Sequence, residues 1–461
     1  MQSIQAVFNS QKKFYSQGKT RSYAFRRNSL KSLYKVIKNN ENALTQALFE
    51  DLHKPATESY LSEIGFMYQE IKHQLKHLRE WMETESKISP LVLFPSRSYV
   101  YQEPQGMVLI LGPWNYPFQL LMAPLVAAIA AGNCVMVKTS SQTPRTAEIT
   151  RRIIQEAFDD QHVSTVEVSG REVIPKLIEP LEFNHIFFTG SVPIGKVIMK
   201  AAADKLARVT LELGGKSPCI VDKTANIKVA AKRIAWAKAF NAGQTCVAPD
   251  YVLVHADVKD ELIKEISRYF EKLGDTHDNS KDYGRIINTK RFLAIRKLMT
   301  SGRIVFGGKV DEANLYIQPT ILDDVTVDDS VMKEEIFGPV LPVISWSTIA
   351  NVFDIVANNP YPLSLYVYTK SKKFEKEIIH NIPFGGGGVN SSIMHLSDPD
   401  IPFGGFQFSG LGNYHGKSGF DAFTHKKSIV KTGTWFDLPL KYAPYKANYL
   451  SWIKSAFKIT E

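Results

Sequence analysis

The residue best suited to covalent chemistry in this sequence is Cys246, which ends the segment FNAGQTC. The chain has 461 residues and only three cysteines. Cys134 and Cys219 lie in apolar runs, where each is predicted to be a small core residue. Cys246 instead follows small polar residues, which favour a sulfur atom beside backbone N–H donors. Such donors favour the reactive thiolate, so the sequence predicts nucleophilic chemistry at Cys246.

Two acidic segments raise the question of a buried carboxylate. Glu212, in VTLELGGKSP, is predicted to end an apolar strand just before two glycines. It could act as a general base with a raised pKa, or accept hydrogen bonds from the N–H groups of Gly214 and Gly215. Glu334 and Glu335, in KEEIFGPV, raise the same question, with a solvated pair as the alternative.

A second polar candidate is Asn115, which Pro113 and Pro117 bracket in the segment PWNYPF. The two prolines restrict the backbone just after a predicted buried strand, so the amide side chain is held in place. An amide N–H held in this way can stabilise a developing oxyanion. The alternative is an asparagine that merely completes a turn between aromatic residues.

A nucleotide contact is predicted in HIFFTGSVPIGKVI, where an apolar strand runs into a helix. Gly190, Ser191 and Gly195 would let a phosphate approach the free N–H groups of that helix. No GxGxxG follows the first strand, and Val197 replaces the Ser or Thr of a P-loop after Lys196. A dinucleotide contact and a plain strand-to-helix turn therefore remain as interpretations.

The elements around these residues predict an α/β protein with two doubly wound parallel sheets. Amphipathic helices are predicted at the start of the chain, and the prolines of PLVLFPSRSYVYQEP favour an extended arm or an edge hairpin over a central strand. Residues 107–137 carry no charge, but their Gly, Pro and Asn residues favour a buried βαβ unit over a membrane span. The segments FGGGGVN and IPFGGFQFSGLGNYHGKSGF are predicted to be packed loops around a site, because their aromatic residues would be costly to expose.

Composition excludes several other classes of protein. The formal charge is +10, but no RNP, KH or zinc-finger pattern accompanies it, so nucleic-acid binding is disfavoured. The odd number of cysteines without any CxxC predicts neither disulfides nor a metal site. The amino-terminal residues lack the apolar core of a signal peptide, which favours a cytoplasmic location.

Taken in order, these segments resemble the aldehyde dehydrogenase superfamily over nearly the whole chain. The resemblance rests on PWNYPF, FTGS with Gly195, LELGGKSP, GQTC, EEIFGPV and PFGGF followed by SG. The phrases GQTCVAPDY and GNYHGKSGFDAFTHKKS look most like the class 3 branch, which includes fatty and aromatic aldehyde dehydrogenases. It implies oxidation of a medium- or long-chain aliphatic or aromatic aldehyde to the acid with NAD or NADP, by a homodimer. A cysteine-dependent hydrolase or acyl-transfer enzyme without a redox cofactor is the alternative.

The resemblance also implies domain ranges. An NAD(P)-binding domain would cover 1–86 and 104–210, and a catalytic domain 211–392. Residues 87–103 and 393–435 would form bridging, oligomerisation and active-site segments, followed by a basic aromatic tail over 436–461.

Residue by residue, the resemblance implies roles for the polar candidates. Cys246 would attack the aldehyde carbon, while Asn115 and the N–H of Cys246 hold the oxyanion. Glu212 would activate the water that hydrolyses the thioester, and relatives that transfer the acyl group to coenzyme A typically lack this residue. Cofactor contacts are implied for Trp114, Lys138, Gly190, Ser191, Gly195, Glu335 and Phe337.

The sequence departs from the family pattern after Lys138, where KTSS replaces the common KPSE. Ser141 therefore stands in place of a carboxylate that would bind a ribose 2′-OH and repel a 2′-phosphate. The hypothesis is that NADP is accepted at least as readily as NAD.

The carboxyl-terminal tail has aromatic residues at helical spacing, namely Tyr445, Tyr449, Trp452 and Phe457. With nearby lysines, such a helix could lie on an acidic membrane surface. Packing on the partner subunit of a dimer is the favoured interpretation.

Overall fold

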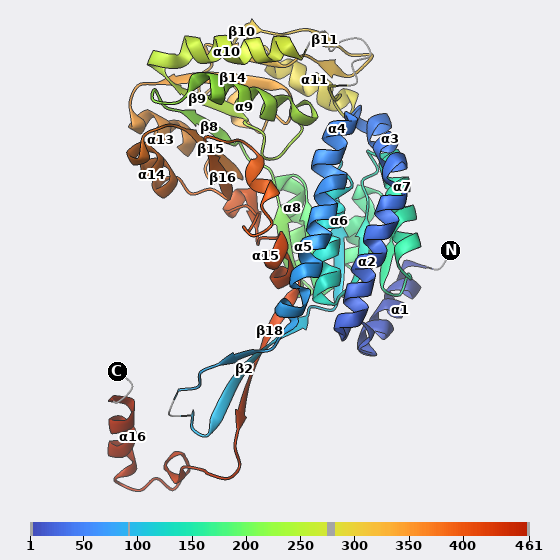
Figure 1. Cartoon of the computed structure of the whole chain (residues 1–461), viewed down its shortest axis with the longest axis vertical. Coiled ribbons are helices and arrows are strands. Elements are labelled where there is room, and N and C mark those ends of the chain that lie inside the picture. Colours follow the sequence, from blue (N-terminus) through green and yellow to red (C-terminus); the bar gives the residue numbers. More distant parts are fainter. Residues whose placement is uncertain (1–2, 91–92, 274–281, 459–461) are drawn as a thin grey trace.

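The computed structural model describes residues 3–90, 93–273 and 282–458, and residues 459–461 of the predicted tail lie outside the described residues. A six-stranded sheet lies beside the amino-terminal helices, and a seven-stranded sheet occupies the other end of the body (Figure 1). A three-stranded antiparallel arm projects away from both. The predicted α/β class, with two parallel sheets and a small β arm, is confirmed.

The six-stranded sheet carries the predicted nucleotide segments at the carboxyl ends of its strands. Its order is β17 (Gly410–Leu411), β7 (Arg208–Glu212), β6 (His185–Thr189), β3 (Met107–Leu111), β4 (Cys134–Lys138) and β5 (Val163–Thr165). All neighbours are parallel except β17, which is antiparallel to β7. Every residue of β3, β4 and β6 is buried, as expected for a sheet covered on both faces.

The uncharged segment over 107–137 is a buried βαβ unit, as predicted. Strands β3 and β4 flank helix α6 (Gln119–Ala131), whose residues are all buried. None of the helices in the described part of the chain is long and apolar enough to cross a membrane.

Helices cover this sheet, beginning with the predicted amphipathic runs at the amino terminus. They are α1 (Ile4–Ser16), α2 (Tyr23–Asn39), α3 (Glu41–Leu52), α4 (Ala56–Ser59), a π-helical turn η2 (Tyr60–Ile64), α5 (Gly65–Met82), α7 (Pro144–Ala157) and α8 (Val192–Ala203). In α2, Leu30, Leu33 and Ile37 are fully buried at helical spacing. Helix α5 packs on α6, so the amino-terminal layer lies directly against the segment that follows β3.

The seven-stranded sheet carries the cysteine segment. Its order is β10 (Arg303–Phe306), β13 (Thr320–Asp323), β14 (Val340–Trp346), β9 (Tyr251–His255), β8 (Pro218–Val221), β15 (Ser364–Tyr368) and β16 (Gly386–Val389). Only β10 pairs antiparallel, with β13. The helices of this part include α9 (Ile227–Ala239), α10 (Lys259–Lys272), α11 (Thr289–Leu298), α12 (Ser330–Lys333), α13 (Ile349–Ala357) and α14 (Lys372–Asn381).

Strand β16 corrects one expectation, because FGGGGVN was predicted to be a loop. Residues 386–389 instead pair in parallel with β15 and form an edge of the sheet. A Cβ atom on Gly387 would lie 1.9 Å from the carbonyl oxygen of Leu365. The glycines therefore permit a close approach of two strands, which composition alone does not distinguish from a flexible loop.

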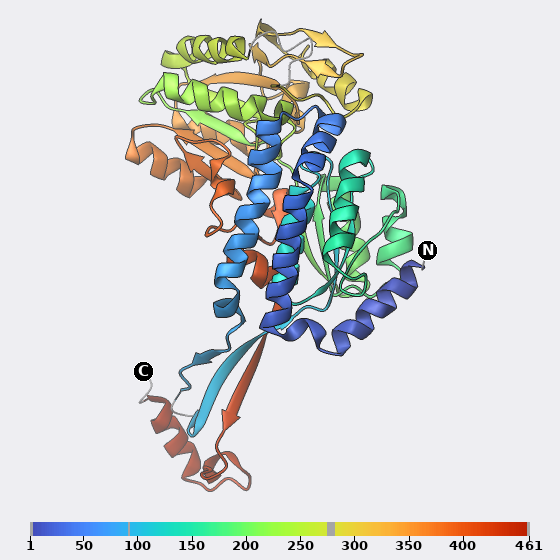
Figure 2. The ribbon, with the colours of Figure 1, turned by 45° about the vertical axis from the view of Figure 1, so that its right-hand side comes forward.

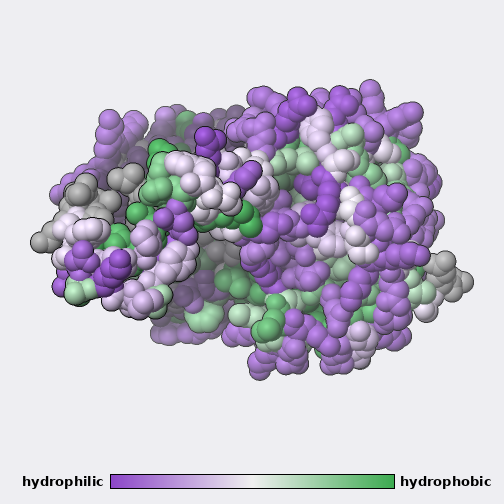
Figure 3. Space-filling view, turned by 90° about the horizontal axis from the view of Figure 1, so that it is seen from below, coloured by the Kyte–Doolittle hydropathy of each residue, from purple (hydrophilic) through white to green (hydrophobic). Residues whose placement is uncertain are grey.

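The arm consists of β1 (Glu85–Lys87), β2 (Ser96–Pro104) and β18 (Thr424–Thr432), with β2 in the middle (Figures 1 and 2). This confirms the extended arm predicted from the prolines. Beyond it, helix α16 (Tyr449–Lys458) begins four residues after Tyr445, so the prediction that Tyr445 shares the helical spacing is wrong. Trp452 and Phe457 are more than half exposed, and apolar side chains gather on the arm and tail in the view from below (Figure 3). Docking of this tail on a partner subunit stays a prediction.

Candidate active site

Cys246 lies where two cavities meet, in the turn between the 3-10 helix η6 (Phe240–Gly243) and β9. One cavity has a volume of about 760 Å³ and runs along the carboxyl ends of the six-stranded sheet. The other, about 320 Å³, is lined mainly by apolar side chains. Cys246 is partly exposed, whereas Cys134 and Cys219 are buried in strands, so the predicted contrast between the three thiols is confirmed.

The small residues of FNAGQTC allow the backbone to turn sharply before Cys246. Asn241, Ala242 and Gly243 have φ values of 52°, 52° and 72°, in the left-handed region. A Cβ atom on Gly243 would lie 2.3 Å from the carbonyl oxygen of Gly338, so no larger residue fits there. The amide of Gln244 then ties the turn down, donating to the carbonyl of Arg285 at 2.8 Å and accepting from the N–H of Ile287 at 3.0 Å.

The surroundings of the Cys246 sulfur both oppose and support ionisation. Burial raises the pKa of this thiol, and the nearby carboxyls of Glu335 and Glu212 raise it further. The backbone N–H groups of Cys246 and Val247 act in the opposite direction and lower the pKa. The predicted backbone donors are therefore present at the sulfur.

The side chain of Asn115 reaches the cysteine turn. Asn115 sits between β3 and α6, and its Nδ2 donates to the carbonyl oxygen of Gln244 at 3.1 Å. It is buried, and it lines the larger cavity together with Cys246 and Glu212. Three residues far apart in sequence are thus brought to one cavity, as the sequence predicted.

Glu212 is the last residue of β7 and is only 3% exposed. Neither carboxyl oxygen has a hydrogen-bond partner among the residues that the structure describes. Burial raises the pKa of this group well above its ordinary value. Of the two alternatives left open by the sequence, the base with a raised pKa agrees with the structure, and the acceptor of glycine N–H groups does not.

The carboxyl that meets those glycines is Glu335, in the segment between α12 and β14. It accepts a hydrogen bond from the N–H of Gly215, and burial raises its pKa to about 8. A Cβ atom on Gly214 would lie 2.1 Å from Oε2 of Glu335, so this approach requires glycine. Glu334 is exposed, and the solvated-pair interpretation therefore holds for Glu334 alone.

The larger cavity has the features of a dinucleotide site. Trp114 and Phe337 meet edge to face with ring centroids 5.3 Å apart, and both line it. Ser191 is the N-cap of α8 but makes no side-chain cap bond, so N–H groups at the start of a helix of 12 residues face the cavity rim beside Gly190. The aromatic pair can contact the rings of a dinucleotide, the helix terminus its phosphates, and the partly buried Glu335 its ribose hydroxyls.

Two predicted cofactor residues do not line this cavity. A Cβ atom on Gly195 would lie 2.7 Å from Cδ2 of Leu213, so this glycine permits close packing of α8 on the chain beyond β7. Lys138 ends β4 at the same edge of the sheet, and its Nζ donates to the carbonyl of Thr139 at 2.9 Å. No group of three or more His, Cys, Asp or Glu side chains in the described ranges is placed to hold a metal ion.

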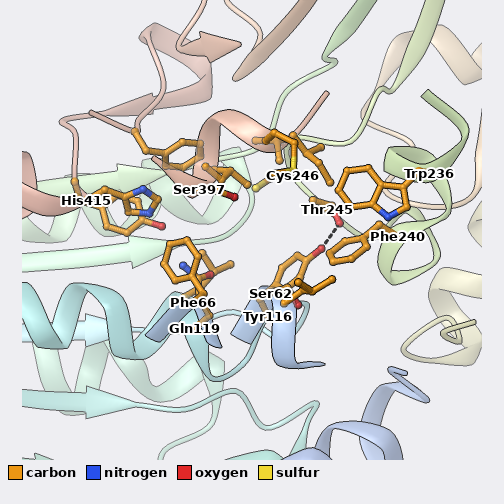
Figure 4. Close-up of a pocket in the computed structure, with 18 residues that line it drawn as sticks. Ser62, Phe66, Tyr116, Gln119, Trp236, Phe240, Thr245, Cys246, Ser397 and His415 are labelled. Atoms are coloured by element: carbon orange, nitrogen blue, oxygen red, sulfur yellow. Dashed lines mark hydrogen bonds between the residues drawn. The ribbon is translucent and has the colours of Figure 1, made fainter. Parts of the chain in front are cut away.

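The smaller cavity opens on the other side of Cys246 (Figure 4). Phe66 and Gln119 rise from helices on one side, Trp236 and Phe240 stand on another, and the sulfur of Cys246 points between them. The remaining wall includes Met394, Leu396, Phe403, Tyr414 and His415.

The glycine-rich segment after residue 400 packs only in part as predicted. Phe403 and Tyr414 are buried, whereas Phe406 and Phe408 are 46% and 54% exposed. The expectation that packing covers all four rings is therefore wrong for the latter two. Both rings rest on Tyr361, and Phe408 forms part of the rim of the larger cavity.

Several residues at the site escaped the sequence analysis. Tyr116 Oη and Thr245 Oγ1 lie 2.6 Å apart next to Cys246 (Figure 4). Arg291 lines the larger cavity, as does Lys196, which the sequence analysis considered only as part of a P-loop. Tyr116 and Thr245 lie in the segments PWNYPF and FNAGQTC. Each hydroxyl is one residue from a candidate, Asn115 or Cys246, and this proximity was the signal in the sequence that could have identified them.

Comparison with known proteins gives one consistent result. A model described as the aldehyde dehydrogenase family matches residues 2–429. The chain is 45% identical over 461 residues to the 4,4'-diaponeurosporen-aldehyde dehydrogenase of Staphylococcus aureus, covering 99% of this chain and 100% of that protein. It is 38% identical to the "Aldehyde dehydrogenase, dimeric NADP-preferring" of Rattus norvegicus, covering 93% and 95%. A solved structure titled "Substrate bound state of Staphylococcus Aureus AldH" superposes with a TM-score of 0.96 at 44% identity, covering 99% and 100%.

Proposed function

This chain belongs to the aldehyde dehydrogenase family, and we propose that it oxidises a medium- or long-chain apolar aldehyde to the carboxylic acid through a thioester on Cys246. The main support for this proposal is the position of Cys246, which lies between an apolar cavity and a cavity suited to a dinucleotide. The cofactor is NAD or NADP. The name of the S. aureus relative, 4,4'-diaponeurosporen-aldehyde dehydrogenase, is that of an enzyme for a long apolar aldehyde and supports this substrate class.

In the first step, the thiolate of Cys246 forms a bond to the aldehyde carbon through a sulfur lone pair, and the carbonyl π electrons move to the oxygen. That oxygen accepts hydrogen bonds from Nδ2 of Asn115 and the N–H of Cys246, which are placed at the same cavity. A bound nicotinamide supplies the hydride acceptor. Loss of hydride from the substrate carbon leaves a thioester on Cys246.

In the second step, Glu212 takes a proton from water, and the water oxygen forms a bond to the thioester carbon. The carbon–sulfur bond then breaks, which releases the acid and returns the thiolate. The absence of any described hydrogen-bond partner for the Glu212 carboxyl supports this role, because both oxygens are available to a water molecule.

The substrate class can be tested with saturated aldehydes of graded length. Each methylene buried in the cavity beside Cys246 stabilises binding by about 0.8 kcal/mol, which is about a fourfold gain. We expect kcat/KM to rise by about this factor per methylene from acetaldehyde upward, until the cavity is filled. Acetaldehyde is the control, since it has no chain to bury, and a flat profile would contradict an apolar substrate.

A cysteine hydrolase without a redox cofactor is disfavoured by the family and by the second, larger cavity. The two functions differ in one readout. An oxidoreductase forms reduced nicotinamide in equal amount to the acid, whereas a hydrolase forms none.

The choice between NAD and NADP can be tested at Ser141, which is exposed and lies three residues beyond the end of β4. We propose that this chain accepts NADP at least as readily as NAD, because no carboxylate stands there to repel a 2′-phosphate. Ser141→Glu is expected to lower kcat/KM for NADP relative to NAD by about tenfold, and Ser141→Gln is the uncharged control. A strong preference of the unmodified enzyme for NAD would contradict the proposal.

A further inference from the structure

A buried ion pair lies beside the oxyanion segment and has no part in the mechanism above. Lys54, between α3 and α4, pairs with Glu63 of η2, and both side chains are 0% exposed. Taking two charges out of water is costly, and their attraction compensates only when further hydrogen bonds satisfy both groups. The further hydrogen bonds of Lys54 and Glu63 therefore indicate which part of the structure the ion pair fixes in place.

Besides its attraction to Glu58, the ammonium of Lys54 has two further contacts, and both go to the segment with Asn115. Its Nζ donates to the carbonyl oxygen of Asn115 at 3.1 Å. The same ammonium lies 4.1 Å from the ring centroid of Tyr116. Lys54 therefore fixes the backbone of Asn115 and the ring that follows it.

Glu63 holds the other end of the same segment. One of its oxygens accepts from the N–H groups of Phe118 and Gln119 at 2.9 and 3.1 Å. These are the N-cap and first residue of α6, and Phe118 gives the helix no side-chain cap. A carboxylate from η2 thus caps α6 from outside, where the helix dipole favours a negative charge.

The amino-terminal layer also reaches the cysteine turn. Glu58 of α4 accepts from the backbone N–H of Asn241 at 2.9 Å. Nδ2 of Asn241 in turn donates to the carbonyl oxygens of Asn115 and Gln244 at 3.0 and 3.1 Å. The carbonyl of Asn115 is therefore held by Lys54 from one side and by the cysteine turn from another.

We propose that Lys54 and Glu63 are positioning residues for the oxyanion donor. They fix the backbone on both sides of Asn115, so that its side-chain N–H meets the oxygen of a substrate bonded to Cys246. Neither residue lines the apolar cavity or the larger cavity, so the pair acts through Asn115 and not by touching substrate or cofactor. The inference rests on the proposed role of Asn115.

The test removes both charges together, because a single substitution would leave the other charge buried without a partner. Lys54→Met with Glu63→Gln keeps an acceptor for the two N–H groups of α6 while it releases the Asn115 carbonyl. We expect kcat to fall by about 10- to 100-fold, with less than a threefold change in cofactor Kd. Lys238→Met is the matched control, because Lys238 is a fully buried lysine whose ammonium has no hydrogen-bond partner among the described residues, and this variant is expected to keep its kcat.

A merely structural role is separated from positioning by a double-mutant cycle with Asn115→Ala. If the pair acts through Asn115, its replacement should cost less than threefold in kcat once Asn115 is alanine. An undiminished cost in that background would overturn the inference and leave the proposed function standing. If Asn115→Ala alone left kcat unchanged, the oxyanion role itself would fall. Lys54→Gln with Glu63→Gln, which also removes both charges and keeps a polar group at each position, has an expected loss of about threefold to tenfold and serves if the first double variant does not fold.

Discussion

Cys246→Ala is expected to abolish aldehyde-dependent reduction of the cofactor, with kcat/KM falling by a factor on the order of 10⁴ or more. The reason is that the sulfur is the only described thiol that reaches both cavities. The rate is measured from the absorbance of the reduced nicotinamide, with cofactor binding measured separately. Because alanine removes only the sulfur from the wall, cofactor Kd should change less than about threefold.

The chain provides two matched controls for this experiment. Cys134 and Cys219 lie within buried strands, where burial raises the pKa of both thiols. Cys134→Ala and Cys219→Ala should lower the melting temperature by a few degrees through lost packing, but keep kcat. Activity that survives in Cys246→Ala would show that the observed reaction does not use this cysteine.

The position of the site was readable from the sequence because candidates followed apolar runs. Glu212 and Gly190 come at the carboxyl ends of β7 and β6, which pair in parallel and therefore end at one edge. Asn115 follows β3, the next strand along that edge. The hydrogen-bond partners of the two carboxyls could not be predicted from the sequence, because they depend on which carboxyl lies close to Gly214 and Gly215 in the folded chain. In the structure, the N–H of Gly215 interacts with Glu335, which comes 120 residues later in the chain and precedes a strand of the other sheet.

The support behind the site was less accessible to sequence analysis. Glu63 lies in a predicted helical run and Lys54 lies between two such runs, and both have many charged neighbours in sequence, where a charge is normally solvated. Only the packing of the amino-terminal layer on α6 shows that these two are buried. In the same way, strand β16 looks like a loop because its glycines remove the β-branched pattern that predicts strands.

Two carboxyls near Cys246 have different surroundings, and this suits them to different tasks. Glu335 is tied to a backbone N–H, and its pKa is raised to about 8, whereas Glu212 has no described partner. Burial raises the pKa of both carboxyls, which favours their neutral forms beside the sulfur of Cys246. Glu212 is then the group free to exchange a proton with water when the thioester is present.

Glu212→Gln is expected to uncouple the two halves of the reaction. The first turnover should still form reduced cofactor in a burst of about one equivalent per active site, because glutamine leaves Cys246 and Asn115 unchanged. Steady-state turnover should then fall by about 10² to 10⁴, since no base activates the hydrolytic water. Rapid mixing resolves the burst, and mass spectrometry should find the acyl group on Cys246. A burst as slow as steady turnover would contradict the assignment of Glu212 to hydrolysis.

The pH dependence of the same variant gives an independent check. Burial raises the pKa of Glu212, so the fraction of carboxylate grows as the pH rises, and steady turnover of the unmodified enzyme should rise with it. That rise should disappear from the hydrolytic step in Glu212→Gln.

The stability of the unmodified enzyme should change with pH in the opposite direction. A buried carboxyl whose pKa is raised in the folded state stabilises the fold fully below its unfolded pKa, and this contribution is lost as the pH rises. Glutamine removes this loss and breaks no described hydrogen bond, so its melting temperature at alkaline pH should equal or exceed that of the unmodified enzyme.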